Sequence, residues 1–120
     1  MGLDTFASHS SDEIELSDAD IQAFSNADIS LCGGIFSGGG NDGSFRGKVY
    51  AELILEITGE SLYSEWIPPE TVQEMCTSLM VCDPEEAADW GYRNTAQEVV
   101  ELRKFFQVCV QRGLGLVGWS

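Results

Sequence analysis

"TAQEVVELRKFFQVCVQRGLGLVGWS", residues 95–120, is the most informative part of the sequence for the fold, because it carries a well-marked helix followed by an apolar tail. Thr95 and Glu98 form a capping box, which predicts the start of the helix. Arg112 and Gly113 are residue types that favour a helix end. The apolar side chains in between repeat at helical spacing and form one face: Val99, Leu102, Phe106 and Cys109.

Both ends of the chain are apolar, which predicts that they pair in a small sheet. Residues 114–119, LGLVGW, indicate a strand after the last helix, and residues 3–6, LDTF, indicate a second strand. Their pairing would explain why the protein carries an apolar tail at all. Residues 29–32, ISLC, alternate weakly in polarity and predict a further short strand that leads into a glycine-rich run.

The remaining helices are marked by caps and by apolar periodicity. Ser17 and Asp20 form a second capping box, Pro69 suits a first helical turn, and Gly59 and Gly91 are helix stops. The predicted helical segments are residues 17–26, 48–58, 69–81 and, as a short turn, 83–90.

Residues 48–58, KVYAELILEIT, are apolar except along one stripe that holds Lys48, Glu52 and Glu56. This pattern predicts a largely buried helix, and a buried strand is the competing interpretation because the run is short. The whole sequence, residues 1–120, then reads as a single domain of the α+β class. We expect about four helices and a small sheet that pairs the two termini, with a mostly α fold as the alternative.

The net charge of −14, from 20 acidic and 6 basic residues, restricts the partners. Direct binding to nucleic acid or to anionic membrane surfaces is disfavoured, because both need clustered Lys and Arg. A basic protein surface or a divalent cation is compatible with this charge. No stretch approaches the roughly 20 apolar residues of a membrane span, and the acidic start lacks the apolar region of a signal peptide. We therefore expect a soluble, cytoplasmic protein.

The four cysteines, Cys32, Cys76, Cys82 and Cys109, include no CxxC pair, so their spacing argues against a zinc site. Cys76 and Cys109 fall within apolar helical patterns, where a free cysteine behaves as a small core residue. Reduced thiols fit a cytoplasmic protein. No metal or cofactor is expected.

Seven of the thirteen glycines lie between Gly33 and Gly47. Clustered glycine amides before a helix can hold a phosphate-type anion. The candidate ligands of such a site are Gly38, Gly40, Gly43, Arg46 and Lys48. A P-loop would need Gly in place of Asp42 and Ser or Thr in place of Val49, so the regular motif is absent. The alternative, which the sequence favours, is a structural connector that can also contact a partner.

Two other kinds of chemistry have weaker candidates. Residues 37–45, SGGGNDGSF, resemble one nonapeptide of a calcium-binding β-roll repeat, but a single copy leaves Asp42 as the only acidic ligand. His9 and Cys32 are the one histidine–cysteine pair outside the core patterns, and would have to meet in space to form a catalytic dyad. The sequence does not decide whether the protein is an enzyme, and it favours a protein without enzymatic activity.

Tyr63 and Trp66, in SLYSEWIPPE, are candidates for an exposed apolar patch that anchors a protein partner. The competing interpretation is that they fold back over the core as a lid.

Four stretches together resemble a set of small uncharacterised bacterial proteins: MGLD, CGGIFSGGGNDGSFRGK, WIPPE and GLGLVGW. The likeness covers nearly the whole chain. It implies a standalone bacterial domain and brings no activity, so it assigns no functional residue.

The function that the sequence favours is protein binding through the glycine-rich loop and the nearby surface, with a partner that is basic if charge selects it. The alternative is an enzyme or small-ligand binder that holds an anion at the loop and the following helix N-terminus. A third hypothesis is a nucleic-acid mimic or an inhibitor of a basic protein.

Overall fold

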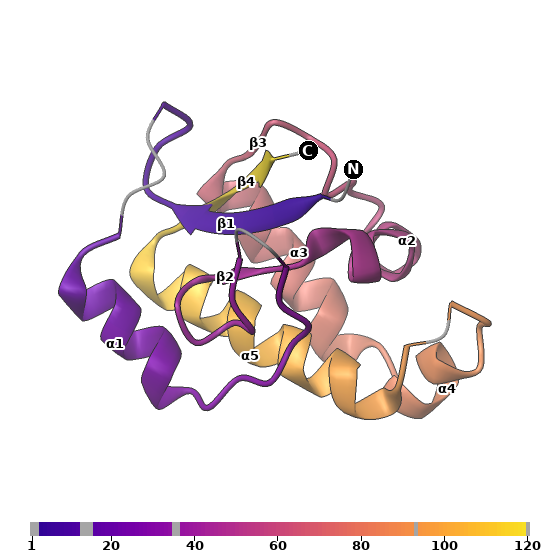
Figure 1. The fold of residues 1–120 in the computed structure, drawn as a ribbon. Helices are drawn as coiled ribbons and strands as arrows, with labels where there is room; N and C mark the ends of the chain where they lie inside the picture. Colours follow the sequence, from indigo (N-terminus) through magenta and orange to yellow (C-terminus); the bar gives the residue numbers. More distant parts are fainter. Residues whose placement is uncertain (1–2, 13–15, 35–36, 93, 120) are drawn as a thin grey trace.

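The computed structural model describes residues 3–12, 16–34, 37–92 and 94–119. Within them the chain forms five helices and four strands (Figure 1). In chain order these are β1 (Asp4–Ser8), α1 (Asp18–Asn26), β2 (Ser44–Phe45), α2 (Gly47–Thr58), β3 (Trp66–Ile67), α3 (Pro69–Val81), α4 (Pro84–Ala88), α5 (Ala96–Arg112) and β4 (Gly115–Trp119). None of the helices in these residues is long and apolar enough to cross a membrane.

The sheet is antiparallel, with the strand order β2-β1-β4-β3. Its two central strands come from opposite ends of the chain, and their register runs from Asp4 opposite Trp119 to Ser8 opposite Gly115. The predicted α+β class and the pairing of the termini are therefore confirmed. The two outer strands are only two residues long, so the sheet offers little unpaired edge.

The core lies between this sheet and the helices, with α3 and α5 side by side beneath it in Figure 1. Phe105 of α5 is at its centre. Its ring centroid lies 4.9 Å from that of Phe24 on α1 and 4.8 Å from that of Phe45 on β2. All three rings are fully buried, so the long C-terminal helix joins α1 and the sheet in one hydrophobic core.

Local signals in the sequence place the helix ends correctly. The capping boxes at Ser17 and Thr95 both form, with each hydroxyl accepting an amide hydrogen bond from the third helical residue. Gly59 and Gly113 follow α2 and α5 in the left-handed conformation that terminates a helix. Residues 48–58 are helical, so the strand interpretation of this segment is wrong.

Three details of the sequence prediction are corrected. Residues 29–32 are not a strand, because the amides of Ser30 and Cys32 donate to the side chains of Glu101 and Tyr50 and not to a neighbouring strand. The strand in this region is β2, which lies between Gly43 and Gly47. Helix α2 is amphipathic and not buried all round, since Val49 and Leu55 face solvent. Met80, near the C-terminal end of α3, is also exposed although it is apolar.

Candidate functional site

The glycine-rich loop is tied to the protein by its own amides. Gly38 N donates to the Ser44 hydroxyl at 2.9 Å, Gly40 N to the Ser44 carbonyl at 2.8 Å, and Gly43 N to the Gly40 carbonyl at 3.2 Å. Leu31 N donates to the Gly39 carbonyl across the loop at 2.8 Å. The three glycines that were candidates for an anion site therefore direct their amides at acceptors within the protein, where they maintain the loop conformation.

Amides in the first turn of α2 also donate hydrogen bonds to acceptors within the protein. Lys48 N donates to the carbonyl of buried Leu3 at 3.0 Å, and Val49 N donates to the Arg46 carbonyl at 3.2 Å. These are two of the first-turn amides that an anion would use. The Lys48 side chain is exposed and forms no ion pair with Glu52 among the described residues.

The Arg46 side chain is half-buried beside Gly34. A methyl group at position 34 would meet the Arg46 guanidinium, the Ser37 hydroxyl and the Asp4 carboxylate. Ser37 donates to Asp4 at 2.7 Å, whereas the guanidinium has no hydrogen bond or ion pair with any described residue. The loop thus brings a buried carboxylate close to Arg46, and its negative charge opposes the attraction of the guanidinium for an added anion.

Asp42, the calcium candidate, has a structural role. Its carboxylate accepts hydrogen bonds from the Ser44 amide at 3.1 Å and the Ser44 hydroxyl at 2.9 Å, which forms a local turn. Among the residues that the structure describes, no three His, Cys, Asp or Glu side chains cluster as metal ligands.

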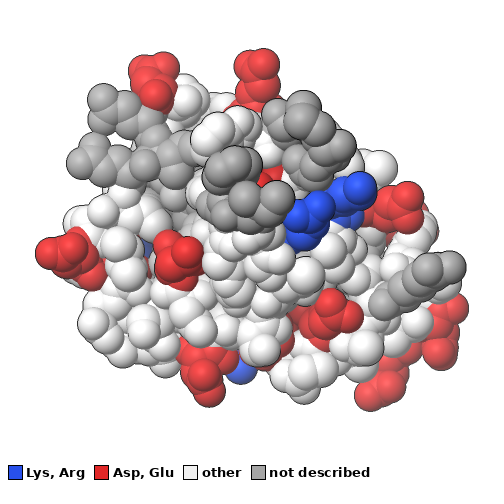
Figure 2. Space-filling model, in the orientation of Figure 1, with Lys and Arg blue, Asp and Glu red and all other residues white. Residues whose placement is uncertain are grey.

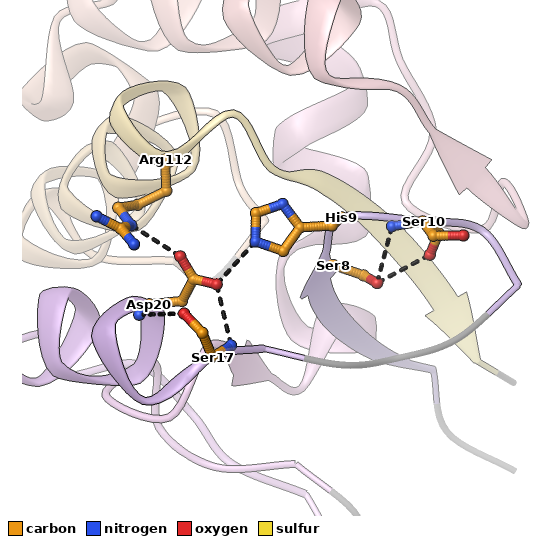
Figure 3. A network of polar contacts seen from close by, with 6 residues as sticks. All are labelled: Ser8, His9, Ser10, Ser17, Asp20 and Arg112. Carbon is orange, nitrogen blue, oxygen red and sulfur yellow. Dashed lines mark hydrogen bonds and ion pairs between the residues drawn. The ribbon is translucent and has the colours of Figure 1, made fainter.

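Asp20 is the centre of a polar network that joins the beginning of the fold to its end (Figure 3). One carboxylate oxygen contacts His9 Nε2 at 2.7 Å and the Ser17 amide at 3.1 Å, and the other accepts a 2.7 Å hydrogen bond from Arg112 Nε. Asp20 is 1% exposed. Burial alone would raise the pKa of this carboxyl, but the hydrogen bonds from Arg112, His9 and Ser17 outweigh it and hold the pKa well below its usual range.

The two members of the candidate catalytic dyad contact other groups. His9 Nε2 contacts Asp20, while the Cys32 thiol points at the Gly33 carbonyl, with Sγ and the oxygen 3.7 Å apart. The sequence marks Asp20 only as a capping residue. Its partner Arg112 lies 92 residues away, and no local pattern could have joined the two.

The partner candidates Tyr63 and Trp66 have different surroundings. Tyr63 is 57% exposed in the loop before β3. Trp66 lies on β3 and is half-buried, with its ring over Gly115 of the neighbouring strand. Of the two, only Tyr63 presents its side chain openly to solvent.

The basic side chains of the C-terminal helix α5 pair with groups of the protein itself. Lys104 forms an ion pair with Glu101 at 2.9 Å and Arg112 with Asp20 at 2.7 Å, and these two carboxylates are only 3% and 1% exposed. Arg103 donates to backbone carbonyls at the C-terminal end of α3. Among the described residues, no exposed carboxylate has an ion-pair partner. Figure 2 shows acidic side chains scattered over one face of the molecule, with Lys and Arg gathered mainly at one place on it.

Comparison with protein-family models, with curated proteins and with solved structures finds no match.

Proposed function

We propose that this protein is a binding module for a basic protein partner and that it works in the cytoplasm. The observation that carries the proposal is the distribution of charge described above. Lys and Arg of α5 serve buried carboxylates and helix carbonyls, and the exposed carboxylates of the described residues are left without ion pairs. The cysteines Cys32, Cys76, Cys82 and Cys109 are free thiols, which supports a reducing compartment.

Such a surface is suited to recruit a partner of opposite charge. Uncompensated charges of one sign repel one another, and this repulsion is relieved when Lys and Arg of a partner come close. The same field steers the encounter and speeds association at low ionic strength. A nucleic-acid mimic that occupies a basic DNA-binding protein would be one form of this function.

The glycine-rich loop has a smaller part in this proposal than its composition suggests. Its amides are committed to the protein, and its carboxylates Asp4 and Asp42 accept hydrogen bonds from neighbouring serines. We therefore assign the loop a structural role and place partner binding on the acidic helical surface.

The test compares the wild-type protein with a variant in which exposed carboxylates are neutralised. The variant carries Glu52→Gln, Glu56→Gln, Glu85→Gln and Glu86→Gln, all at helical positions on the surface. Both proteins are immobilised and exposed to a bacterial lysate at low and at high salt. The proposal expects a basic protein that the wild type retains at low salt and releases at high salt, and that the variant retains poorly. Retention that is equal for both proteins and insensitive to salt would contradict it.

A further inference from the structure

Residues of α2, α3 and α4 line a groove at the α4 end of the molecule. Figure 1 shows where these three helices lie. Its volume is about 310 Å³. Its lining combines two kinds of side chain, apolar and acidic: Ile57, Val81 and Trp90 on the one hand, and Glu56, Asp83 and Glu86 on the other.

The apolar part of the groove is open to solvent. Val81, the last residue of α3, is 81% exposed, and the large ring of Trp90 is also exposed in part. Isolated exposed apolar residues are common, but here they adjoin a concave surface, which is where an apolar side chain of a partner would lose most contact with water.

The rim of the groove is acidic. Of the described residues that line it, three are carboxylates and none is Lys or Arg. Arg103, a cation among the described residues, has its guanidinium occupied by hydrogen bonds to the carbonyls of Leu79, Met80 and Cys82. The pKa of the Cys82 thiol in the groove is raised, by burial first, and Glu86 and Asp83 add to the rise while Arg103 opposes it. The rim of the groove therefore carries negative charge, which Arg103 partly offsets at Cys82.

We propose that this groove binds an amphipathic helix of the basic partner. Aliphatic side chains on one face of that helix would pack against Val81 and Trp90, and flanking Lys and Arg would reach Glu56, Asp83 and Glu86. This inference rests on the proposed function, since it names the part of the partner that is recognised. A second copy of the chain fits poorly, because it would bring a net charge of −14 to an acidic rim.

Two substitutions test the groove without disturbing the fold. Val81→Ser removes apolar contact at a side chain that is already 81% exposed. Glu56→Lys reverses a rim charge near the C-terminus of α2, where a cation favours the helix dipole, so lost binding would not come from a weakened helix. The matched controls are Ile21→Ser on α1 and Asp12→Lys in the loop before α1, both exposed and at the other end of the molecule (Figure 1).

The probe is a synthetic Leu/Lys peptide designed as an amphipathic helix, compared with a scrambled peptide of the same composition and with a Leu/Glu counterpart. Affinities are measured by calorimetry at low salt. We expect the Leu/Lys helix to bind the wild type and both controls with similar affinity, and Val81→Ser and Glu56→Lys to bind roughly tenfold more weakly each. The bound peptide should also slow alkylation of Cys82, which lies in the groove, and leave exposed Cys32 unaffected.

The other outcomes overturn the inference in distinguishable ways. If the Leu/Lys helix and the scrambled peptide bind all five proteins equally, charge alone attracts the partner; the groove proposal then fails while the proposed function stands. If neither basic peptide binds at low salt, the groove proposal and the proposed function fail together.

Discussion

The glycine-rich loop and the groove between α2, α3 and α4 are opposite kinds of surface. In the loop, the amides of Gly38, Gly40 and Gly43 and the carboxylate of Asp42 all have partners within the protein. In the groove, exposed apolar side chains stand beside carboxylates that form no ion pairs with described residues. These loop amides and the Asp42 carboxylate already have partners, whereas the exposed side chains of the groove would gain contacts from a binding partner.

The contrast between the loop and the groove shows that an unusual composition does not by itself mark a functional site. A glycine cluster attracts attention because so many functional loops are rich in glycine, yet glycine is also required wherever a chain must turn tightly against its own core. The groove is formed by ordinary residues, and its character comes from where three helices place them. Substitutions in the two regions test whether the loop serves the fold and whether the groove is free to bind a partner.

Gly40→Ala should have the largest effect, because the loop conformation leaves no room for a side chain. Gly40 has φ of +105°, and a Cβ at this position would press on the Cγ2 of Ile29 and lie 3.1 Å from the Ile29 Cβ. Backbone strain and overpacking together should lower the free energy of unfolding by about 3 kcal/mol, measured by urea denaturation.

Gly59→Ala is the matched control for this loss. Gly59 also has a positive φ, of +77°, but a Cβ added there would meet no neighbouring atom within 4 Å. The expected loss is about 1 kcal/mol, from backbone strain alone. Equal losses at the two positions would mean that the loop is not packed against the protein, and the contrast with the groove would weaken.

Asp20→Asn should come next, because it removes the buried charge that His9 and Arg112 share. We expect a loss of about 2 kcal/mol at neutral pH, below the usual cost of breaking a buried ion pair because both partners can turn to solvent. Asp12→Asn, in an exposed loop, should change the free energy of unfolding by less than about 0.5 kcal/mol.

The contribution of Asp20 to the free energy of unfolding should also decrease as the pH falls. The pKa of Asp20 is lower in the folded protein than in the unfolded chain, where it is about 4. Its contribution to stability is therefore complete above that value and is lost as the pH falls toward the folded pKa. Below about pH 5 the wild type should lose stability more steeply than Asp20→Asn. Parallel curves for the two proteins would show that the network contributes little.

The sequence predicts those parts of the fold that depend on neighbouring residues. Ser17 with Asp20 and Thr95 with Glu98 give both capping boxes, because cap and partner lie within one turn. The apolar ends of the chain also predict the pairing of β1 with β4, since an exposed apolar tail would be costly.

The features that the sequence does not predict depend on distant parts of the chain. Asp20 and Arg112 meet only when α5 has packed beside α1. Strand β2 is two residues long and has no periodicity of its own. Val81 belongs to the same apolar run as buried Leu79, and only the packing of α3 decides that one faces solvent and the other does not. The sequence does not predict the groove either, because the packing of three helices forms it.

Val81→Ser should leave stability unchanged within about 0.5 kcal/mol, since little of this side chain is in contact with the protein. Leu79→Ala, two residues earlier and fully buried, should cost about 3 kcal/mol. Thermal or urea unfolding measures both. A large loss for Val81→Ser would mean that Val81 supports the fold, and the view of the groove as a surface that awaits a partner would no longer hold.

The smallest expected effect is the response of the loop to anions. In an amide NMR titration with pyrophosphate, the signals of Gly38, Gly40 and Gly43 should show no saturable shift, because each of these amides already donates to a protein acceptor. Arg46→Ala should give the same result. Saturable shifts in the wild type that disappear in Arg46→Ala would establish an anion site at the loop. They would also contradict the contrast between the loop and the groove. The loop amides would then bind a ligand, although without it they hydrogen-bond within the protein.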